Sequence, residues 1–98
     1  MKRRAVIRVY GEVQGVGFRS WTARRAQRAG LSGYVRNEPD GSVLIVVEGE
    51  EESIARLIEE CRKGPPLARV ERVDVEWQEY RGEFQDFEIR YRDYELPR

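Results

Sequence analysis

A glycine-rich stretch that ends in an arginine, GEVQGVGFR, occupies residues 11–19. Gly11, Gly15 and Gly17 have no Cβ atom, so the backbone there can adopt left-handed conformations and approach a bound group closely. Such a loop can turn successive N–H groups toward an anion, and Arg19 adds a planar, permanently charged fork for two further oxygens. These residue types indicate a phosphate-binding loop, although a plain loop with bulges uses glycine in the same way.

A second polar residue of interest, Asn37, stands at the end of an apolar stretch and directly before NEPDGS. In a split-βαβ sheet the end of this strand lies near the glycine-rich connection. Asparagine also caps turns with its own side chain, and taken alone this residue favours the turn-capping role.

The rest of the composition excludes several classes of catalysis. The sequence has no histidine and a single cysteine, Cys61, which removes histidine-based phosphatase chemistry, Ser-His triads, most catalytic zinc sites and a disulfide framework. Neither Lys2 nor Lys63 lies in a Gly-Lys-Ser/Thr phosphate loop, and Ser20 replaces the third glycine of a dinucleotide fingerprint. We therefore predict a site without metal or cofactor.

The charge balance and hydropathy limit the partners of the protein. Basic and acidic residues number 18 each, so no net field draws the chain toward nucleic acid or acidic lipid. No apolar stretch approaches the ~20 residues of a membrane span, and the N-terminus has no signal-peptide pattern. SVLIVVEG, at residues 42–49, lacks the aromatic residues on which an RNA-recognition sheet stacks bases. We expect a cytoplasmic protein, a monomer for lack of an exposed apolar stripe, with no nucleic-acid or membrane partner.

Hydrophobic periodicity predicts the elements that must position these residues. Alternating residues predict strands, and apolar residues at intervals of three and four predict helices. Ile54, Leu57, Ile58 and Cys61 form such a helical stripe, which places Cys61 in the core. Strands are predicted at 5–10, 31–37, 42–49, 72–77 and 87–91, and helices at about 20–29, where Thr22, Ala23, Ala26 and Ala29 form the small-residue stripe, and at 50–64.

The order of these elements, βαββαβ, predicts the fold class. It is typical of an α+β, ferredoxin-like split-βαβ sandwich, with an antiparallel sheet and two helices on one face. Ninety-eight residues provide one core. We predict a single domain over residues 1–98, with its core in 5–91 and a short tail, 92–98, that shows no pattern.

Three parts of the chain resemble the acylphosphatases. They are GEVQGVGFR at residues 11–19, GLSGYVRN with DGSV at 30–37 and 40–43, and FEIRY at 87–91. The resemblance covers nearly the whole chain, and the spacing of 18 positions from the arginine to the asparagine is specific to it. It implies hydrolysis of the carboxyl–phosphate bond of small acyl phosphates to a carboxylate and inorganic phosphate, without a metal or a covalent intermediate.

The resemblance also implies a role for each site residue. Arg19 would bind the phosphoryl group and Asn37 would hold the attacking water, in place of the turn-capping role. Tyr34 stands where tryptophan is common in the family, which we expect to alter core packing, and residues 92–98 extend beyond the usual end. The backbone expected to line the phosphate cradle is that of Gln14, Gly15, Val16, Gly17 and Phe18.

Two other functions remain open from the sequence. One is a domain of the same fold that handles carbamoyl phosphate within a larger maturation enzyme, although such domains are followed by zinc-finger segments that this sequence lacks. The other is a module that binds an anion or RNA without catalysis.

Overall fold

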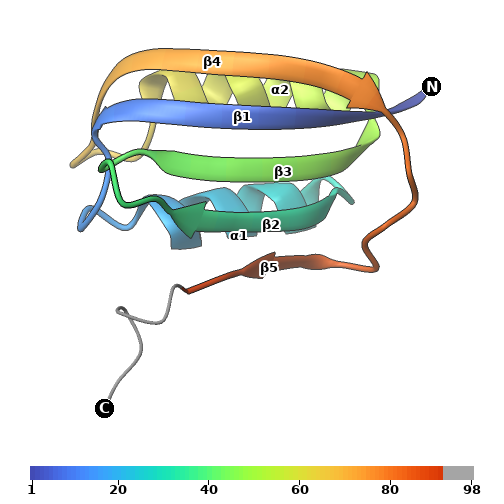
Figure 1. Cartoon of the computed structure of the whole chain (residues 1–98), viewed down its shortest axis with the longest axis horizontal. Helices are drawn as coiled ribbons and strands as arrows, with labels where there is room; N and C mark the ends of the chain where they lie inside the picture. Colours follow the sequence, from blue (N-terminus) through green and yellow to red (C-terminus); the bar gives the residue numbers. More distant parts are fainter. Residues whose placement is uncertain (92–98) are drawn as a thin grey trace.

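The elements follow one another in the predicted order. The computed structural model describes residues 1–91, and residues 92–98, for which the sequence shows no pattern, lie outside the described part. Within residues 1–91 the elements are β1 (Lys2–Glu12), α1 (Phe18–Arg28), β2 (Ser32–Asn37), β3 (Val43–Glu50), α2 (Glu51–Lys63), β4 (Arg69–Glu79) and β5 (Phe87–Ile89) (Figure 1).

The strands form one sheet in the order β4-β1-β3-β2-β5. β1 pairs antiparallel with β3 and β4, and β2 pairs antiparallel with β3. β5 differs from the expected antiparallel pattern, because it pairs with β2 in parallel. After β4 the chain crosses over to the far edge of the sheet and then runs in the direction of β2 (Figure 1).

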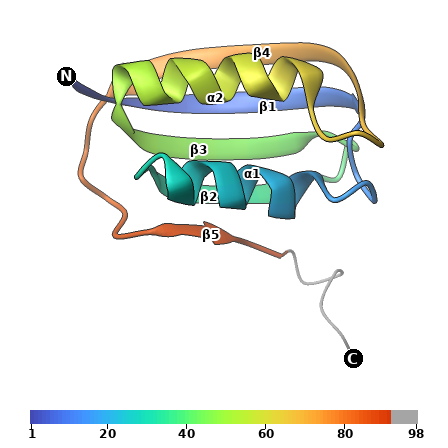
Figure 2. The same ribbon diagram turned by 180° about the vertical axis from the view of Figure 1, so that it is seen from behind.

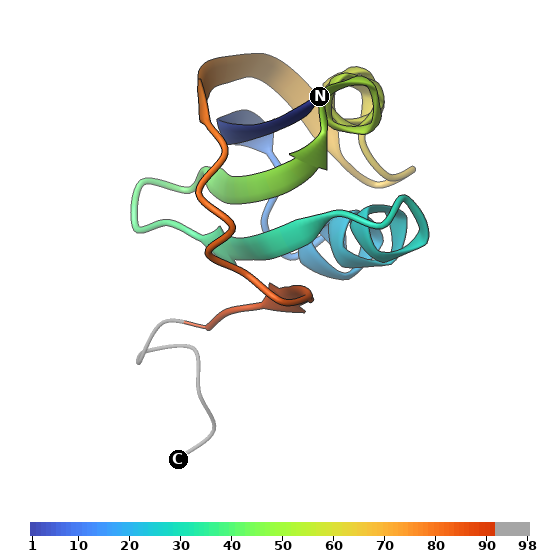
Figure 3. The same cartoon turned by 90° about the vertical axis from the view of Figure 1, so that its right-hand side faces the viewer.

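Both helices pack on one face of the sheet, as the sequence predicts (Figures 2 and 3). The core between them and the sheet contains Ala5, Ile7 and Val9 of β1, together with residues of β3 and the apolar stripe of α2. Cys61 belongs to this core with no exposed surface, which confirms its structural role. Burial raises the pKa of its thiol to about 12, so the nucleophilic thiolate is not formed near neutral pH.

Helix α1 begins at Phe18, two residues before the expected start. The side chains of Phe18 and Trp21 are buried and their rings lie 5.3 Å apart, so they anchor the helix start to the core. Ala29, expected on the buried stripe, is exposed instead, because the helix ends at Arg28 and Ala29 caps it. Gly30 follows with φ 71°, a left-handed conformation that commonly stops a helix.

Strand β1 extends further than predicted and includes Gly11. A bulge lies between Tyr10 and Gly11 in the pairing with β4, and Gly11 has φ 130°. A Cβ atom there would collide with the backbone carbonyl of Arg69. The sheet therefore requires this first glycine of the stretch, and the loop proper begins after β1.

The crossover between β4 and β5 is held to the open face of the sheet by Glu48, which has no exposed surface. Its carboxylate accepts hydrogen bonds from the N–H groups of Arg81 at 2.8 Å and Glu83 at 3.0 Å, and from Arg4 Nη1 at 3.3 Å. Burial by itself would raise the pKa of Glu48, but these donors outweigh it and hold the pKa below its ordinary value.

Tyr34 lies on this open face, and its ring meets the edge of Phe84 in the crossover at 5.8 Å. Tyr34 therefore packs against the crossover, and not in the core between the sheet and the helices where its effect was expected.

Candidate active site

The loop between β1 and α1 has the backbone conformation that an anion site needs. Gly15 has φ 75° and Gly17 has φ 80°, both left-handed, and a Cβ atom at either would meet nothing within 4 Å. Backbone conformation, and not lack of space, therefore requires glycine at both positions. Gly17 is the N-cap of α1, where its carbonyl accepts the N–H of Trp21 at 3.0 Å.

The start of α1 is the positive end of a helix dipole. No side chain caps it by a hydrogen bond, and its first turn contains no Asp or Glu. The first N–H groups of a helix have no partner within it, and together with the helix dipole they attract anions. The helix start and the loop thus form one electropositive cradle.

The side chain of Gln14 joins this loop to the β2–β3 turn. Its Nε2 donates hydrogen bonds to the backbone carbonyls of Glu38 and Ser42, each at 2.9 Å. Both acceptors lie in the turn that follows Asn37, so the clamp fixes the distance between the loop and the end of β2. The sequence predicted only a backbone role for Gln14, and this side-chain contact was missed.

Arg19 and Asn37 line the same small pocket, of about 90 Å³, with Gly15, Gly17 and Phe18. It lies where the β1–α1 loop, the end of β2 and the end of β5 come together, at the left of Figure 1. Two predicted cradle residues do not line the pocket: Gln14 forms the clamp just described, and Val16 packs against the core.

Asn37 reaches the pocket because of strand alternation. Gly33, Val35 and Asn37 share the buried face of β2, the face that the helices cover. The Asn37 residue is only 6% exposed. Since β2 ends there, its side chain lies beside the start of α1 and not under its middle.

The turn after Asn37 has its own side-chain cap. Asp40 Oδ1 accepts the Ser42 N–H at 2.9 Å and the Ser42 hydroxyl at 2.6 Å. These two hydrogen bonds, with a smaller contribution from Arg8, lower the pKa of Asp40. Asp40 thus caps this turn with its own side chain.

The carboxylates nearest the loop in the sequence lie outside the pocket. Glu38 is engaged by Arg36 Nε at 2.7 Å and lies 3.8 Å from Arg8 Nη1. Glu12 is largely exposed, 3.9 Å from Arg69. Among the residues described as lining the pocket, Arg19 is the one charged side chain.

Comparison with known proteins gives the same result over nearly the whole chain. A family model for acylphosphatases matches residues 5–89. The chain belongs to the acylphosphatase family. It is 50% identical over 91 residues to an acylphosphatase of Geobacter sulfurreducens, an alignment that covers 93% of this chain and all of that one. The membership confirms the resemblance seen in the sequence, the fold class and the assignment as a hydrolase.

Solved acylphosphatase structures share the fold in detail. The structure of an acylphosphatase from Coxiella burnetii superposes with a TM-score of 0.86 and 36% identity, covering 91% of this chain and 93% of that one. Full-length HypF in its phosphate- and nucleotide-bound form matches with a TM-score of 0.81 and 33% identity, over 95% of this chain and 12% of that much longer one. The acylphosphatase fold therefore also occurs as a small part of a larger protein.

Three residues of this acylphosphatase-family pocket were missed from the sequence: Val13, Ser20 and Tyr91. Tyr91 was expected to lie within the last strand, but β5 ends at Ile89 and the ring lies 4.8 Å from Arg19 Cζ. Ser20 was expected to begin the helix and instead lies in its first turn. A predicted helix start at Phe18 would have placed Ser20 in the first turn, and so among the residues of the site.

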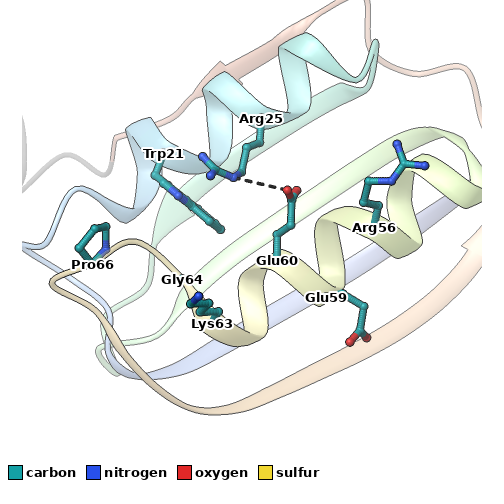
Figure 4. A pocket seen from close by; sticks show the side chains of 8 residues that line it. All are labelled: Trp21, Arg25, Arg56, Glu59, Glu60, Lys63, Gly64 and Pro66. Atoms are coloured by element: carbon teal, nitrogen blue, oxygen red, sulfur yellow. Dashed lines mark ion pairs between the residues drawn. The ribbon is translucent and has the colours of Figure 1, made fainter.

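A wider hollow of the acylphosphatase domain, of about 690 Å³, lies elsewhere, between α1 and α2 (Figure 4). There Arg25 stacks on the ring of Trp21 at 4.2 Å and lies 3.7 Å from Glu60. Arg25 is half-buried in this position, while Arg24 and Arg28 of the same helix are exposed. The predicted site residues do not line this groove.

The described part of this acylphosphatase-family chain has neither a metal-binding cluster nor a helix that could span a membrane. Within residues 1–91 no three His, Cys, Asp or Glu side chains gather closely enough to hold a metal ion. Neither helix there has the length and apolarity required to cross a bilayer.

Proposed function

We propose that Arg19 and Asn37 share the work of hydrolysing a small acyl phosphate in the pocket at the start of α1. Arg19 binds the phosphoryl group together with the N–H groups of the cradle, and Asn37 holds the attacking water. The observation that carries this assignment is that both side chains line one pocket of about 90 Å³ at a helix start whose N-cap is a glycine.

The proposed reaction is a displacement at phosphorus. The water oxygen forms a bond to phosphorus, the bond from phosphorus to the acyl oxygen breaks with its electron pair, and the carboxylate leaves. The water proton is lost to the phosphate product or to solvent. A carboxylate is a good leaving group, so no strong general acid is required, and the absence of histidine is compatible with the reaction.

The protein then has two tasks, positioning and charge neutralisation. The guanidinium of Arg19 can contact two phosphoryl oxygens at once, and the N–H groups at the helix start meet the charge that spreads over these oxygens in the transition state. The Asn37 amide has both a donor and an acceptor, so it can hold a water molecule with a lone pair directed at phosphorus.

The size of the pocket limits what it recognises. A volume of about 90 Å³ corresponds to roughly three water molecules. We propose that this small space takes the phosphoryl group and the water while the acyl group extends toward solvent. We therefore propose that the site selects the acyl-phosphate linkage and tolerates different acyl groups.

Hydrolysis of benzoyl phosphate by the purified chain in the presence of EDTA tests this function. We expect release well above the spontaneous rate, loss of that release in Arg19→Ala, and no response to added magnesium. A rate equal to the spontaneous one would leave a non-catalytic anion-binding module. Activity removed by EDTA and restored by magnesium would contradict the metal-independent mechanism.

The absence of a covalent intermediate has its own test. Of the residues described as lining the pocket, Ser20 and Tyr91 carry hydroxyl groups that could in principle attack phosphorus. Ser20→Ala and Tyr91→Phe should both remain active, within about threefold of the native chain. Loss of nearly all activity in either variant would indicate a phosphoenzyme.

The carbamoyl phosphate alternative requires a domain of this fold within a larger enzyme, and the match to a segment of full-length HypF shows that the fold occurs within a larger protein. The same cradle would bind the phosphoryl group of either compound. Comparing kcat/KM for carbamoyl phosphate and benzoyl phosphate separates the two functions. We expect the two values to lie within about tenfold, and a preference for carbamoyl phosphate beyond a hundredfold would favour the alternative.

For the protein as a whole we propose a cytoplasmic monomer that acts on small molecules and binds no nucleic acid. The equal numbers of basic and acidic residues support this. Light scattering at micromolar concentration should give the mass of one chain, and a dimer mass would contradict the proposal.

A further inference from the structure

An aromatic ring lies over the residue to which phosphate binding is assigned. The ring centroid of Tyr91 is 4.8 Å from the guanidinium carbon of Arg19, and both residues line the pocket. Tyr91 is 52% exposed, so the ring lies at the mouth of the pocket and not in the core. An exposed tyrosine this close to the site is not needed for folding the core.

The sheet fixes where this ring lies. β5 pairs with β2 in the register Gly33↔Phe87 and Val35↔Ile89, and the Arg90 N–H donates to the Val35 carbonyl at 2.9 Å. Continued by two residues, the register brings Tyr91 beside Asn37. The side chain therefore reaches the pocket by backbone pairing at the edge of the sheet.

The neighbouring residue holds the chain in the same place. Arg90 stacks on the ring of Tyr34 at 4.0 Å and donates from Nε to Glu88 at 2.9 Å. These contacts lie on the open face of the sheet, while alternation sends Tyr91 toward the pocket. The backbone hydrogen bond and the side-chain contacts of Arg90 thus hold the chain directly before Tyr91 against β2.

Stacking on a ring acts on an arginine in a particular way. It engages the flat face of the guanidinium and restricts rotation of a long side chain, whereas the N–H donors lie in the plane and point from its edge toward oxygens. A fork held in this way loses less conformational entropy when it binds a phosphoryl group.

We propose that Tyr91 is a positioning residue for Arg19: its ring holds the face of the guanidinium so that the fork points into the phosphoryl pocket. This inference rests on the proposed role of Arg19 in binding phosphate. Tyr91 itself is assigned no contact with the reacting atoms, and its hydroxyl group is not required.

Three variants test the proposal. Tyr91→Leu removes the ring, Tyr91→Phe keeps the ring without the hydroxyl, and Tyr80→Leu is the matched control. Tyr80, which directly follows β4, is 44% exposed, and Lys2 Nζ lies 5.5 Å from its ring. This is a comparable contact outside the pocket. The measurements are the dissociation constant of inorganic phosphate by calorimetry, and kcat and KM for acetyl phosphate and benzoyl phosphate.

For Tyr91→Leu we expect a two- to fivefold weaker affinity for phosphate, since an exposed cation–π contact contributes on the order of 0.5–1 kcal/mol. KM should rise by about the same factor for both substrates, because the lost contact concerns only their shared phosphoryl group. Tyr91→Phe and Tyr80→Leu should bind phosphate as the native chain does. The melting temperature of Tyr91→Leu should change no more than that of Tyr80→Leu.

Several results would overturn the proposal. Unchanged phosphate affinity in Tyr91→Leu would show that the ring does not position Arg19, and a loss for benzoyl phosphate alone would make it a contact for the acyl group. A loss in Tyr91→Phe equal to that in Tyr91→Leu would assign the effect to the hydroxyl. The phosphate measurement needs no turnover, so a chain that binds phosphate through Tyr91 and Arg19 but hydrolyses nothing would refute the proposed function and not this inference.

Discussion

Arg19 provides the charge of the pocket, and its shape matters as much as its sign. A guanidinium offers two parallel N–H donors to a phosphoryl group, whereas an ammonium is a point charge. We therefore expect Arg19→Lys to lower kcat/KM for benzoyl phosphate by at least about tenfold, and Arg19→Ala by about a hundredfold or more. Both variants should keep the native circular dichroism spectrum. Lysine activity within about twofold of the native chain would contradict a bidentate contact.

Gly17 affects both the loop and helix α1, because its φ angle of 80° starts the helix and shapes the cradle. Valine resists a left-handed conformation, so Gly17→Val should abolish phosphate binding. Gly30→Val is the matched control, since Gly30 has φ 71° and equally open space at the other end of the helix. Both variants should be destabilised in urea, by about 1–2 kcal/mol or more, and only Gly17→Val should lose phosphate affinity. Similar affinities in both would show that the loop is not the cradle.

Gln14 couples two elements, the β1–α1 loop and the β2–β3 turn. Gln14→Met keeps the length of the side chain but removes the donor to the carbonyls of Glu38 and Ser42. We expect a loss of about 1–3 kcal/mol in the free energy of unfolding, together with a lower kcat, because the loop and Asn37 are no longer held together. Urea denaturation and steady-state kinetics measure the two effects. A stability loss with unchanged kcat would restrict Gln14 to a structural role.

Hydrophobic periodicity predicts where the helices and strands lie, but it does not predict how the strands pair. The stripe containing Leu57 and Cys61 predicts α2 closely, because one helix face is buried against the sheet. The start of α1 is missed because its N-cap is a glycine with φ > 0 and not the usual side-chain cap. The direction of β5 is missed as well, since a strand of three residues carries no signal of its partner.

The candidate site follows the same division. Arg19 and Asn37 are predicted as site residues from their resemblance to a family motif. Helix α1 and strand β2 then bring them to one pocket. The side chain of Gln14 and the ring of Tyr91 are not predictable in this way. Their roles arise from contacts between segments far apart in the chain, and the residue types alone are ordinary for a surface.

The stability of the whole molecule should depend on acid pH, because a buried carboxylate holds the crossover from β4 to β5. The lowered pKa of Glu48 means that the folded state favours its carboxylate form. Its contribution to stability is therefore complete above the ordinary pKa of 4.5 and is lost as the pH falls through the lower pKa of the folded state. The unfolding free energy of the native chain should fall steeply below about pH 4.5.

Glu48→Gln tests this origin of acid sensitivity. Removing one partner of a buried ion pair destabilises by about 3 kcal/mol, so the variant should be less stable at pH 7 and lose stability less steeply in acid. Urea denaturation at several values between pH 3 and pH 7 measures both effects. A variant with the native slope in acid would show that other carboxylates cause the transition.

The central claim, that Arg19 binds the phosphoryl group and Asn37 holds the water, is tested most directly by one comparison in Asn37→Ala. The turnover number for benzoyl phosphate and the inhibition constant of inorganic phosphate are measured on the same preparation. We predict that kcat falls by about a hundredfold or more while the inhibition constant stays within about twofold. Equal losses in both would place Asn37 among the phosphate ligands. A nearly native kcat with about 1 kcal/mol of lost stability would reduce it to a turn residue, and either result would contradict the proposed division of roles.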